Sequence, residues 1–469
     1  MRFLRPDTEF SSLTAEEFAA RLDPLLCAST GPLGVAVSGG PDSMALLHLT
    51  DAWARGHGRA LLVYTVDHGL RPEAVVEAGR VGQVCAMAGR PHRILRWLGT
   101  KPGSGLQAAA RRARYDLMAQ ACRDDGVVDL LLAHHLEDQA ETVLHRIDRG
   151  TGPDGLAGMA RVRAFDGVRL LRPLLDVPKV RLLATCRSVG VEWAEDPSNS
   201  DPRFARTELR QLAPVLADVG VTSIRLGRLA SAMASARAAL DGFTADWMAQ
   251  HASVLLVGAV RMNRAVLVEA PVVLRRRLID RALRAIGGNN YPLRSDGLER
   301  LLAWIEADRP ETRTRTRTLA GCRVEIAGDG LTILRDWRQA ARPVVIAAHG
   351  RGRWDCRFEI ENPTSSPVRV GVCGGEGWRR WRRTAQSSAL AGRPMVAHAA
   401  RLALPAVLDL DGGIGLPHLV HSAPAPSGWV GEDVRIRFRP TVPFLTTDRR
   451  PGDGVDPRPS QPCNGRQAT

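Results

Sequence analysis

The chain has 469 residues, an apolar content of 44% and a formal net charge of +14. This length predicts roughly three domains rather than one, and the basic excess favours a polyanionic partner, with nucleic acid first, over an acidic one. A basic enzyme without such a partner is the competing interpretation. The eight cysteines are scattered without a C-x-x-C pair, which argues against a zinc ribbon, an iron–sulfur site and a disulfide framework.

The N-terminal segment carries acidic residues early and has no apolar core segment, so it is not expected to be a signal peptide. Thr14 followed three residues later by Glu17 is typical of a capping box, and predicts that a helix begins there. No uninterrupted apolar run of about 18 residues occurs. We therefore expect no membrane span and a cytoplasmic protein.

Short aliphatic runs alternate with helical patterns up to about residue 215. Strands are expected at 33–38, 60–66 and 128–134, with a further candidate at 167–171. Helical patterns lie between them, at 44–55 and 106–124. This alternation predicts an α/β domain with a parallel sheet covered on both faces, in which ligands bind at the carboxyl ends of the strands.

The sequence Ser-Gly-Gly-Pro-Asp-Ser, residues 38–43, lies between the first predicted strand and a helix. The glycines let the backbone turn tightly, and a helix N-terminus attracts anions, so the segment predicts a phosphate-binding loop. The hydroxyls of Ser38 and Ser43 can donate to phosphate oxygens. Asp42 would repel a phosphate unless a cation intervened, and it therefore indicates Mg²⁺. The competing interpretation is a plain strand–turn–helix with a helix cap at Asp42 or Ser43.

Four polar residues follow the strand expected at 128–134, namely His134, Asp138, Glu141 and His145. Their spacing would place them on one face of a helix, near the predicted loop. Carboxylates there could hold magnesium or orient a nucleophilic amine. Zinc binding and a merely solvated acidic helix are the alternatives.

The stretch from about 216 to 320 is expected to be mainly helical. Leu229, Met233, Ala236, Leu240, Phe243 and Trp247 recur at three- and four-residue spacing, which predicts the core face of a helix. Residues 272–288 predict a second helix that stops at two glycines. Arg313, Arg315 and Arg317 would share one face of a strand, either as a cationic stripe for phosphates or as a solvated edge.

The remaining residues, from 321, contain β-like segments and the sequence Trp-Arg-Arg-Trp-Arg-Arg at 378–383. Two tryptophans among arginines suit phosphate contact and base stacking, or else a surface turn anchored by one tryptophan. The tail from Arg449, rich in Pro, Gly and Asp, is expected to be disordered.

Several stretches together resemble one family. "SGGPDS" resembles the pyrophosphate loop of the N-type ATP pyrophosphatases, and further stretches match the tRNA(Ile)-lysidine synthases of that superfamily in order and spacing. These are "VDHGLRPE" (66–73), "QAAARRARY" (107–115), the stretch 133–159, "RPLL" (172–175) and the stretch 193–210. The resemblance covers about residues 30 to 210 well and weakens beyond them.

The resemblance implies an ATP-dependent ligase. The C2 carbonyl oxygen of the wobble cytidine of a tRNA(Ile) with a CAU anticodon is adenylated, pyrophosphate leaves, and free L-lysine displaces AMP to give lysidine. ATP would bind the loop formed by Ser38, Gly39, Gly40, Pro41, Asp42 and Ser43, with Mg²⁺ at Asp42.

The resemblance also assigns roles outside the loop. Arg111 would offset charge on the phosphates, while Asp138 and Glu141 would bind or deprotonate the lysine ammonium. His134 and Arg206 would bind substrate. Partners would be tRNA(Ile) and lysine, with no membrane and with a homodimer as an open alternative.

The sequence departs from the family at Gln107, Glu137 and Thr207. The change at Thr207 puts in doubt the role that the family's segment has in packing or tRNA contact.

The alternative functions are another adenylating tRNA-modifying enzyme such as a thiolase, an amide-forming synthetase on a nucleotide, and an RNA-binding protein without catalysis.

We expect the chain to divide into a catalytic domain at 1–215, a helical tRNA-binding or linker domain at 216–320, an α+β region that binds tRNA at 321–448, and the tail at 449–469.

Overall fold

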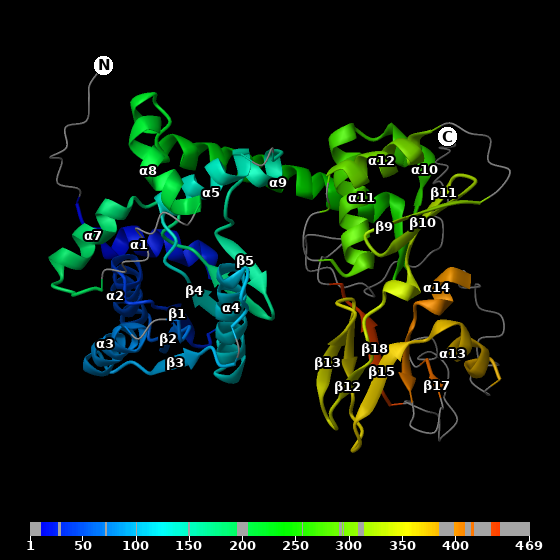
Figure 1. Cartoon of the computed structure of the whole chain (residues 1–469), viewed down its shortest axis with the longest axis horizontal. Coiled ribbons are helices and arrows are strands. Elements are labelled where there is room, and N and C mark those ends of the chain that lie inside the picture. Colours follow the sequence, from blue (N-terminus) through cyan, green and yellow to red (C-terminus); the bar gives the residue numbers. More distant parts are fainter. Residues whose placement is uncertain are drawn as a thin grey trace, which may run out of the picture. The chain divides into compact units, whose positions relative to one another are not determined.

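The structure is a computed structural model of the whole chain (Figure 1). It describes residues 11–26, 30–70, 73–99, 101–148, 151–194, 205–255, 257–289, 293, 295–307, 314–383, 398–408, 414–416 and 433–440. Contacts divide the chain into two compact units, Met1–Ala238 (unit 1) and Ala239–Thr469 (unit 2). The disordered tail predicted from Arg449 lies outside the described residues.

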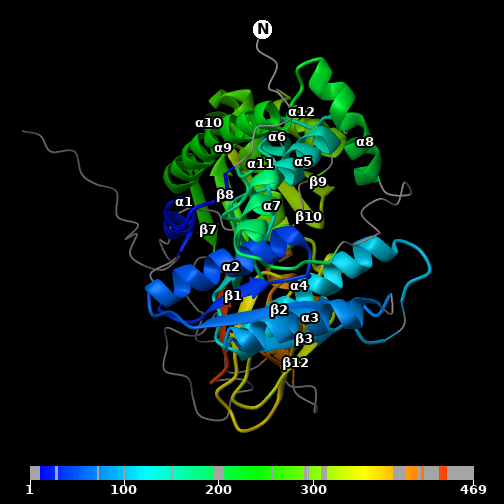
Figure 2. The same ribbon diagram turned by 90° about the vertical axis from the view of Figure 1, so that its left-hand side faces the viewer.

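Unit 1 is built on a six-stranded sheet. In sheet order its strands are β3 (His92–Arg96), β2 (Leu61–Asp67), β1 (Leu33–Ala36), β4 (Asp129–Leu131), β6 (Val168–Leu171) and β5 (Val162–Phe165). Every neighbouring pair is parallel except β5 with β6, which form an antiparallel hairpin. Strands β1, β2 and β3 lie side by side in Figure 2. The predicted parallel sheet is therefore confirmed, with β3 and β5 as strands that the sequence analysis did not predict.

The helices of unit 1 alternate with these strands. They are α1 (Ala15–Leu22), the 3₁₀ helix η1 (Asp23–Leu25), α2 (Pro41–Gly56), α3 (Glu73–Met87), α4 (Leu106–Asp124), α5 (Leu136–Asp148), α6 (Pro153–Leu156), α7 (Lys179–Ser188), α8 (Ala205–Asp218) and α9 (Ser223–His251), which continues into unit 2. The Thr14 hydroxyl accepts from the Glu17 backbone N–H and the Glu17 carboxylate accepts from the Thr14 backbone N–H. The predicted capping box is confirmed.

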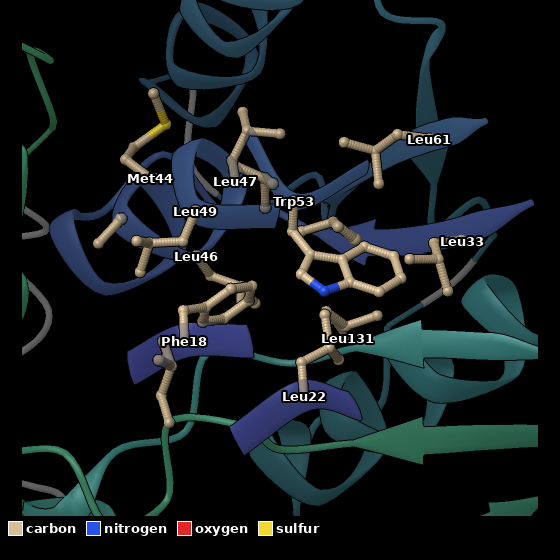
Figure 3. Close-up of a cluster of buried hydrophobic side chains, with 14 of the residues drawn as sticks. Phe18, Leu22, Leu33, Met44, Leu46, Leu47, Leu49, Trp53, Leu61 and Leu131 are labelled. Carbon is tan, nitrogen blue, oxygen red and sulfur yellow. The ribbon is translucent and has the colours of Figure 1, made fainter. Parts of the chain in front are cut away.

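Alternate residues of each strand supply two separate hydrophobic cores, one on each face of the sheet. On β4, Leu131 packs into a core with helices α1, α2 and α7 (Figure 3), while its neighbour Leu130 packs into a core with α4. In Figure 3, Phe18 and Leu22 of α1 lie opposite the side chains of α2 and β1. This alternation follows from the two-residue period of a strand. It leaves the strand ends as the places where polar residues can gather.

Helix α9 forms where predicted, but its predicted core face is wrong. Phe243 is 62% exposed and Leu229 is 37% exposed. Leu226 and Ala230, near the start of the helix, pack with α5 in unit 1, whereas Met248 near its end belongs to a core of unit 2. Because the two ends of the helix contribute to different cores, no single apolar face runs along its length.

The described residues of unit 2 form three antiparallel sheets. The first has the order β7 (Ala252–Leu255), β8 (Ala259–Asn263), β11 (Gly330–Arg335), β10 (Cys322–Ala327) and β9 (Arg315–Leu319). It shares a hydrophobic core with α11 (Val272–Gly287) and α12 (Ser295–Glu306), beside the short α10 (Arg264–Glu269). Strands thus occur within 216–320 alongside the predicted helices, and the boundary expected at 320/321 falls in the turn between two paired strands.

The other two sheets complete unit 2. One has the order β12 (Val344–Ile346), β15 (Val368–Val372), β16 (Pro405–Leu408) and β17 (Ile414–Gly415), and the other has β13 (Arg351–Trp354), β14 (Phe358–Glu361) and β18 (Arg435–Phe438). The 3₁₀ helix η3 (Trp337–Gln339) and helices α13 (Gly374–Trp381) and α14 (His398–Leu402) accompany them. The antiparallel pairing agrees with the α+β region expected here.

Two arginine-rich stretches of unit 2 have defined settings. Arg315 and Arg317 share one face of the edge strand β9, with their guanidinium carbons 5.3 and 5.7 Å from the ring centroid of Trp304; Arg313 lies outside the described residues. In α13, Trp381 is buried and its ring centroid lies 5.0 Å from that of Trp378. Trp378 is partly buried against the same core, so both tryptophans hold this stretch, which begins on a helix rather than a turn.

No helix in the described part of the chain is both long and apolar enough to cross a membrane.

Candidate active site

The loop after β1 has the geometry of an anion site. Gly39 has φ of +90°, a left-handed conformation that glycine adopts without strain. The Ser43 hydroxyl accepts from the Ser38 backbone N–H at 3.1 Å and donates to the Gly40 carbonyl at 2.9 Å. These bonds close the loop just where α2 begins, with Pro41 in the first turn. The positive end of a 16-residue helix therefore faces the space beside the loop.

The alternative of a helix cap at Asp42 or Ser43 is wrong. The residue that caps α2 is Gly40, and it makes no side-chain capping bond. The Oδ1 atom of Asp42 is buried and has no hydrogen-bond partner among the described residues. Its Oδ2 atom lies 3.5 Å from His135 Nε2 and 3.9 Å from Lys179 Nζ. One oxygen of this carboxylate thus faces two cations, and the other has no partner within the described residues.

A magnesium ion fits this arrangement only in part. Mg²⁺ binds proteins through one or two carboxylates and takes its remaining oxygens from water and phosphate. No cluster of three or more His, Cys, Asp or Glu side chains suited to a metal occurs within the described ranges. The unpartnered oxygen of Asp42 can therefore supply one ligand to an ion shared with phosphates, but no all-protein cage surrounds it.

His135 is a central residue of the site that the sequence analysis missed. It is 4% exposed, its Nδ1 lies 2.9 Å from Glu137 Oε2, and its Nε2 lies 3.5 Å from Asp138 Oδ2. Burial opposes charge on this ring, but hydrogen bonds to Asp42 and Glu137, with the nearby carboxylate charges, outweigh it and raise the pKa to about 10. His135 is therefore an imidazolium at neutral pH. The paired histidines at 134 and 135 were the only sequence signal for it.

Helix α5 begins at Leu136, so His134 precedes the helix instead of sharing a face with Asp138, Glu141 and His145 as predicted. Asp138 stands in the first turn, where its Oδ2 accepts from the His135 backbone N–H at 3.1 Å. This is half of a capping box, and it ties the start of the helix to the site. Glu141 follows one turn later and is buried. Both predicted carboxylates thus belong to the helix that begins at the carboxyl end of β4.

Arg111 and His134 are linked through two residues that had no assigned role. Arg172, directly after β6, donates from Nε to His134 Nδ1 at 3.3 Å, and Arg111 Nη2 donates to the Tyr115 hydroxyl at 3.4 Å. A hydrogen bond joins Arg172 to Tyr115. Burial raises the pKa of the Tyr115 phenol, but the surrounding arginines outweigh burial and lower it. In the sequence, the motif "RPLL" (172–175) was the one signal that indicated Arg172.

The segment before α8 is described only in part. The Ala194 backbone N–H donates to the Gly39 carbonyl at 2.9 Å, which ties the start of the segment 193–210 to the loop. Arg206 belongs to α8, but its side chain lies outside the described residues, as does the side chain of Thr207. The structure therefore brings together Asp42, His135 and Asp138 beside the loop, and gives no setting for Arg206.

Comparisons with known proteins agree with this geometry. A family model described as "PP-loop domain" matches residues 13–216. A tRNA(Ile)-lysidine synthase from Rhodopseudomonas palustris is 45% identical over 309 residues, which cover 64% of this chain and 89% of that protein. The enzyme of the same name from Methylobacterium nodulans is 42% identical, with 68% and 95% covered. That from Ruegeria pomeroyi is 36% identical, with 85% and 90% covered. The similarity thus spans most of the length of each relative.

Proposed function

The chain belongs to the tRNA(Ile)-lysidine synthase family, and from this membership we propose how its residues perform the reaction. The family resemblance seen in the sequence is confirmed. The chain is therefore an ATP-dependent ligase that modifies tRNA, as predicted. The reaction transfers AMP from ATP to the C2 carbonyl oxygen of the wobble cytidine of tRNA(Ile), and the amine of lysine then attacks C2 and displaces AMP together with that oxygen. AMP and pyrophosphate are released.

The observation that carries the proposal is the state of Asp42. Its Oδ1 is buried without a partner in the described chain, at the N-terminus of a helix and next to a glycine loop. A buried carboxylate oxygen without a partner is costly, so such a group is retained where a ligand completes it. We propose that Ser38 to Ser43 hold the phosphates of ATP, and that Asp42 Oδ1 holds Mg²⁺.

When bound, Mg²⁺ would neutralise charge on the phosphate oxygens of ATP. The cations already present support the same pocket. The side chains of His135 and Lys179 face Asp42, and both would offset the negative charge on the phosphate oxygens as pyrophosphate forms. Lys179 is one of only two lysines in the chain, the other being Lys101. As a compact charge on a flexible stem it suits phosphate.

We propose that Asp138 and Glu141 receive the ammonium of free lysine. They lie on α5, one turn apart, and Asp138 sits within 3.5 Å of His135. A carboxylate pair here attracts the ammonium and can take its proton, which the amine must lose before it attacks C2. The imidazolium of His135 keeps the charge of this acidic cluster in balance while no substrate is bound.

The surroundings of the other predicted residues support their proposed roles less directly. Arg111 reaches the site through Tyr115 and Arg172, which supports a role in offsetting phosphate charge. We propose that His134 binds substrate. We also propose that unit 2, whose exposed arginines include Arg379 and Arg380, binds the tRNA. A cytoplasmic location follows from the substrate, and the homodimer stays a prediction.

The test is incorporation of labelled lysine into a tRNA(Ile) transcript with a CAU anticodon, measured together with pyrophosphate release. We expect both products in equal amounts, and neither from a transcript in which uridine replaces the wobble cytidine. Release of pyrophosphate without lysine incorporation would overturn the proposal and favour another adenylating reaction on the same loop.

A further inference from the structure

Arg172 has an unusual setting for an arginine. It is 3% exposed, yet the titratable groups that act on it are Tyr115, Arg163 and Arg111, with no carboxylate among them in the described part of the chain. Burying a guanidinium without a carboxylate partner costs free energy, and burial does lower its pKa. This cost is offset where the N–H donors of the guanidinium hold particular neighbouring groups in place.

Those donors lie along three segments that meet at the carboxyl edge of the sheet. Nη1 donates to the Ala160 carbonyl at 2.7 Å, which fixes the guanidinium plane against the chain before β5. Nε donates to His134 Nδ1 at 3.3 Å, and the guanidinium also bonds to Tyr115 of α4. With its plane fixed in this way, the side chain presents Nε–H to the imidazole ring.

The chemistry of this contact determines the tautomer of His134. A guanidinium has five N–H donors and no acceptor, and it stays protonated in proteins. The nitrogen that faces Nε–H must therefore be an acceptor, so Nδ1 of His134 carries no proton. A neutral imidazole has a single proton, which then lies on Nε2. An imidazolium would place an N–H and a positive charge against the guanidinium.

We propose that Arg172 is a positioning residue that holds His134 as the neutral tautomer with its proton on Nε2, so that His134 donates a hydrogen bond to an acceptor oxygen of the substrate. The inference rests on the proposed function for the identity of that substrate. His134 follows β4, which pairs with β1, so it lies at the same sheet edge as the phosphate loop. Acceptor oxygens there belong to ATP phosphates or to the cytidine.

The first test reads the tautomer directly. The full chain, labelled with ¹⁵N-histidine, is examined by long-range ¹H–¹⁵N correlation at neutral pH, and the signal of His134 among twelve histidines is assigned from a His134→Gln sample. We expect an acceptor-type Nδ1 and a protonated Nε2. A proton on Nδ1, or an imidazolium, would overturn the proposal. This readout needs no turnover, so it stands apart from any failure of lysidine formation.

The second test changes the partner. Arg172→Gln offers both an amide N–H and a carbonyl oxygen to Nδ1, so the two tautomers become mixed, whereas Arg172→Lys still offers only a donor and should keep the proton on Nε2. If both variants leave His134 as in the parent, Arg172 does not set the tautomer. Hydrogen exchange of β4 and β6 checks that each variant is folded.

The third test probes the donor and its acceptor. The amide of glutamine places N–H near the position of Nε2, and that of asparagine near Nδ1, so kcat should fall about tenfold for His134→Gln and about 100-fold for His134→Asn. Equal losses would contradict the proposal. The Nε2 signal should shift with a non-hydrolysable ATP analogue if the acceptor is a phosphate, or with an anticodon stem-loop RNA if it is the cytidine. No shift with either would overturn the role in substrate binding.

Discussion

Each unit of this protein holds a charged cluster around one aspartate, and the two clusters are built differently: the Asp355 side chain is buried, and the Asp42 side chain is 24% exposed. In unit 2, Asp355 accepts four hydrogen bonds, two from Arg335, one from Arg357 and one from the Ala341 backbone N–H, at 2.8 to 3.0 Å. In unit 1, one oxygen of Asp42 has no partner among the described residues and the other has cations only at 3.5 and 3.9 Å. Asp355 is complete, and Asp42 is not.

The complete cluster serves the fold. Asp355 lies in the turn between β13 and β14 with φ of 54°, a left-handed conformation that is strained for a residue other than glycine. Arg335 ends β11, so the ion pairs join two sheets of unit 2. Gly288 lies so close that a Cβ there would approach the Asp355 carbonyl to 2.6 Å. The incomplete cluster instead lies at a sheet edge beside a glycine loop, where a ligand can complete it.

The difference between the two clusters predicts that substitution of Asp42 causes the largest loss of activity. Asp42→Asn removes the negative charge but keeps the shape of the side chain, so pyrophosphate release should fall about 10²- to 10³-fold. Binding of tRNA, measured by filter retention, should be unchanged. Asp124→Asn, an exposed residue of α4 in the same unit, is the control and should be as active as the parent. Unchanged release from the Asp42 variant would remove the basis for an incomplete ligand site.

At Asp355 we expect substitution to lower the stability of unit 2 rather than to act on the phosphate site. Asp355→Asn leaves two buried guanidinium groups without a carboxylate, and should destabilise unit 2 by about 3–5 kcal/mol. Hydrogen exchange of peptides from β11 and β14 measures this local stability. Asp329→Asn, in the exposed turn before β11, is the matched control. Hydrogen exchange of β1 and β4 in unit 1 should stay as in the parent; if β11 also exchanges as slowly as in the parent, the cluster is not structural.

The two clusters should also differ in their response to pH. The pKa of His135 is raised to about 10 in the folded protein, so the stability it contributes is complete below its unfolded value of about 6.5 and is lost as the pH rises between these values. Without nucleotide, unit 1 should lose about 1 kcal/mol for each pH unit in that range. Within the described chain the Asp355 cluster holds no histidine, and although burial lowers the pKa of Arg357 to about 10, a lowered pKa of a base does not remove stability as the pH rises, so unit 2 should show no such loss.

Hydrogen exchange at pH 7 and pH 9, corrected for the intrinsic exchange rate, tests this difference. His135→Asn should abolish the pH dependence of unit 1, because asparagine does not titrate. A unit 1 that is equally stable at both pH values in the parent protein would show that the ring is not charged.

The smallest effect is expected at Lys179, whose side chain is 41% exposed. Lys179→Met should raise KM for ATP about tenfold with little change in protein stability, because exposed ion pairs contribute little to folding. Lys179→Arg keeps the charge and should recover most of the affinity. Lys101→Met, at the lysine that lies over Trp97, is the control. If neither KM for ATP nor kcat changes, Lys179 has no role at the phosphates.

Much of unit 1 was predictable because the signals are local. A run of aliphatic residues forms a buried strand wherever it meets a sheet, and Gly39 marks a turn with a left-handed conformation that other residues avoid. The loop, its aspartate and the parallel sheet followed from neighbours in the chain. By contrast, the apolar pattern of α9 did not reveal which face is buried, because its two ends pack into different cores.

The sequence by itself determined the loop of residues 38–43, the helix that carries Asp138 and Glu141, and the family. Only the tertiary structure decided that His135 rather than His134 faces Asp42, and that Arg172 faces His134. The physical reason is that these contacts join strand ends 38 to 93 residues apart in the chain. Which groups meet there depends on strand order and on where α5 begins.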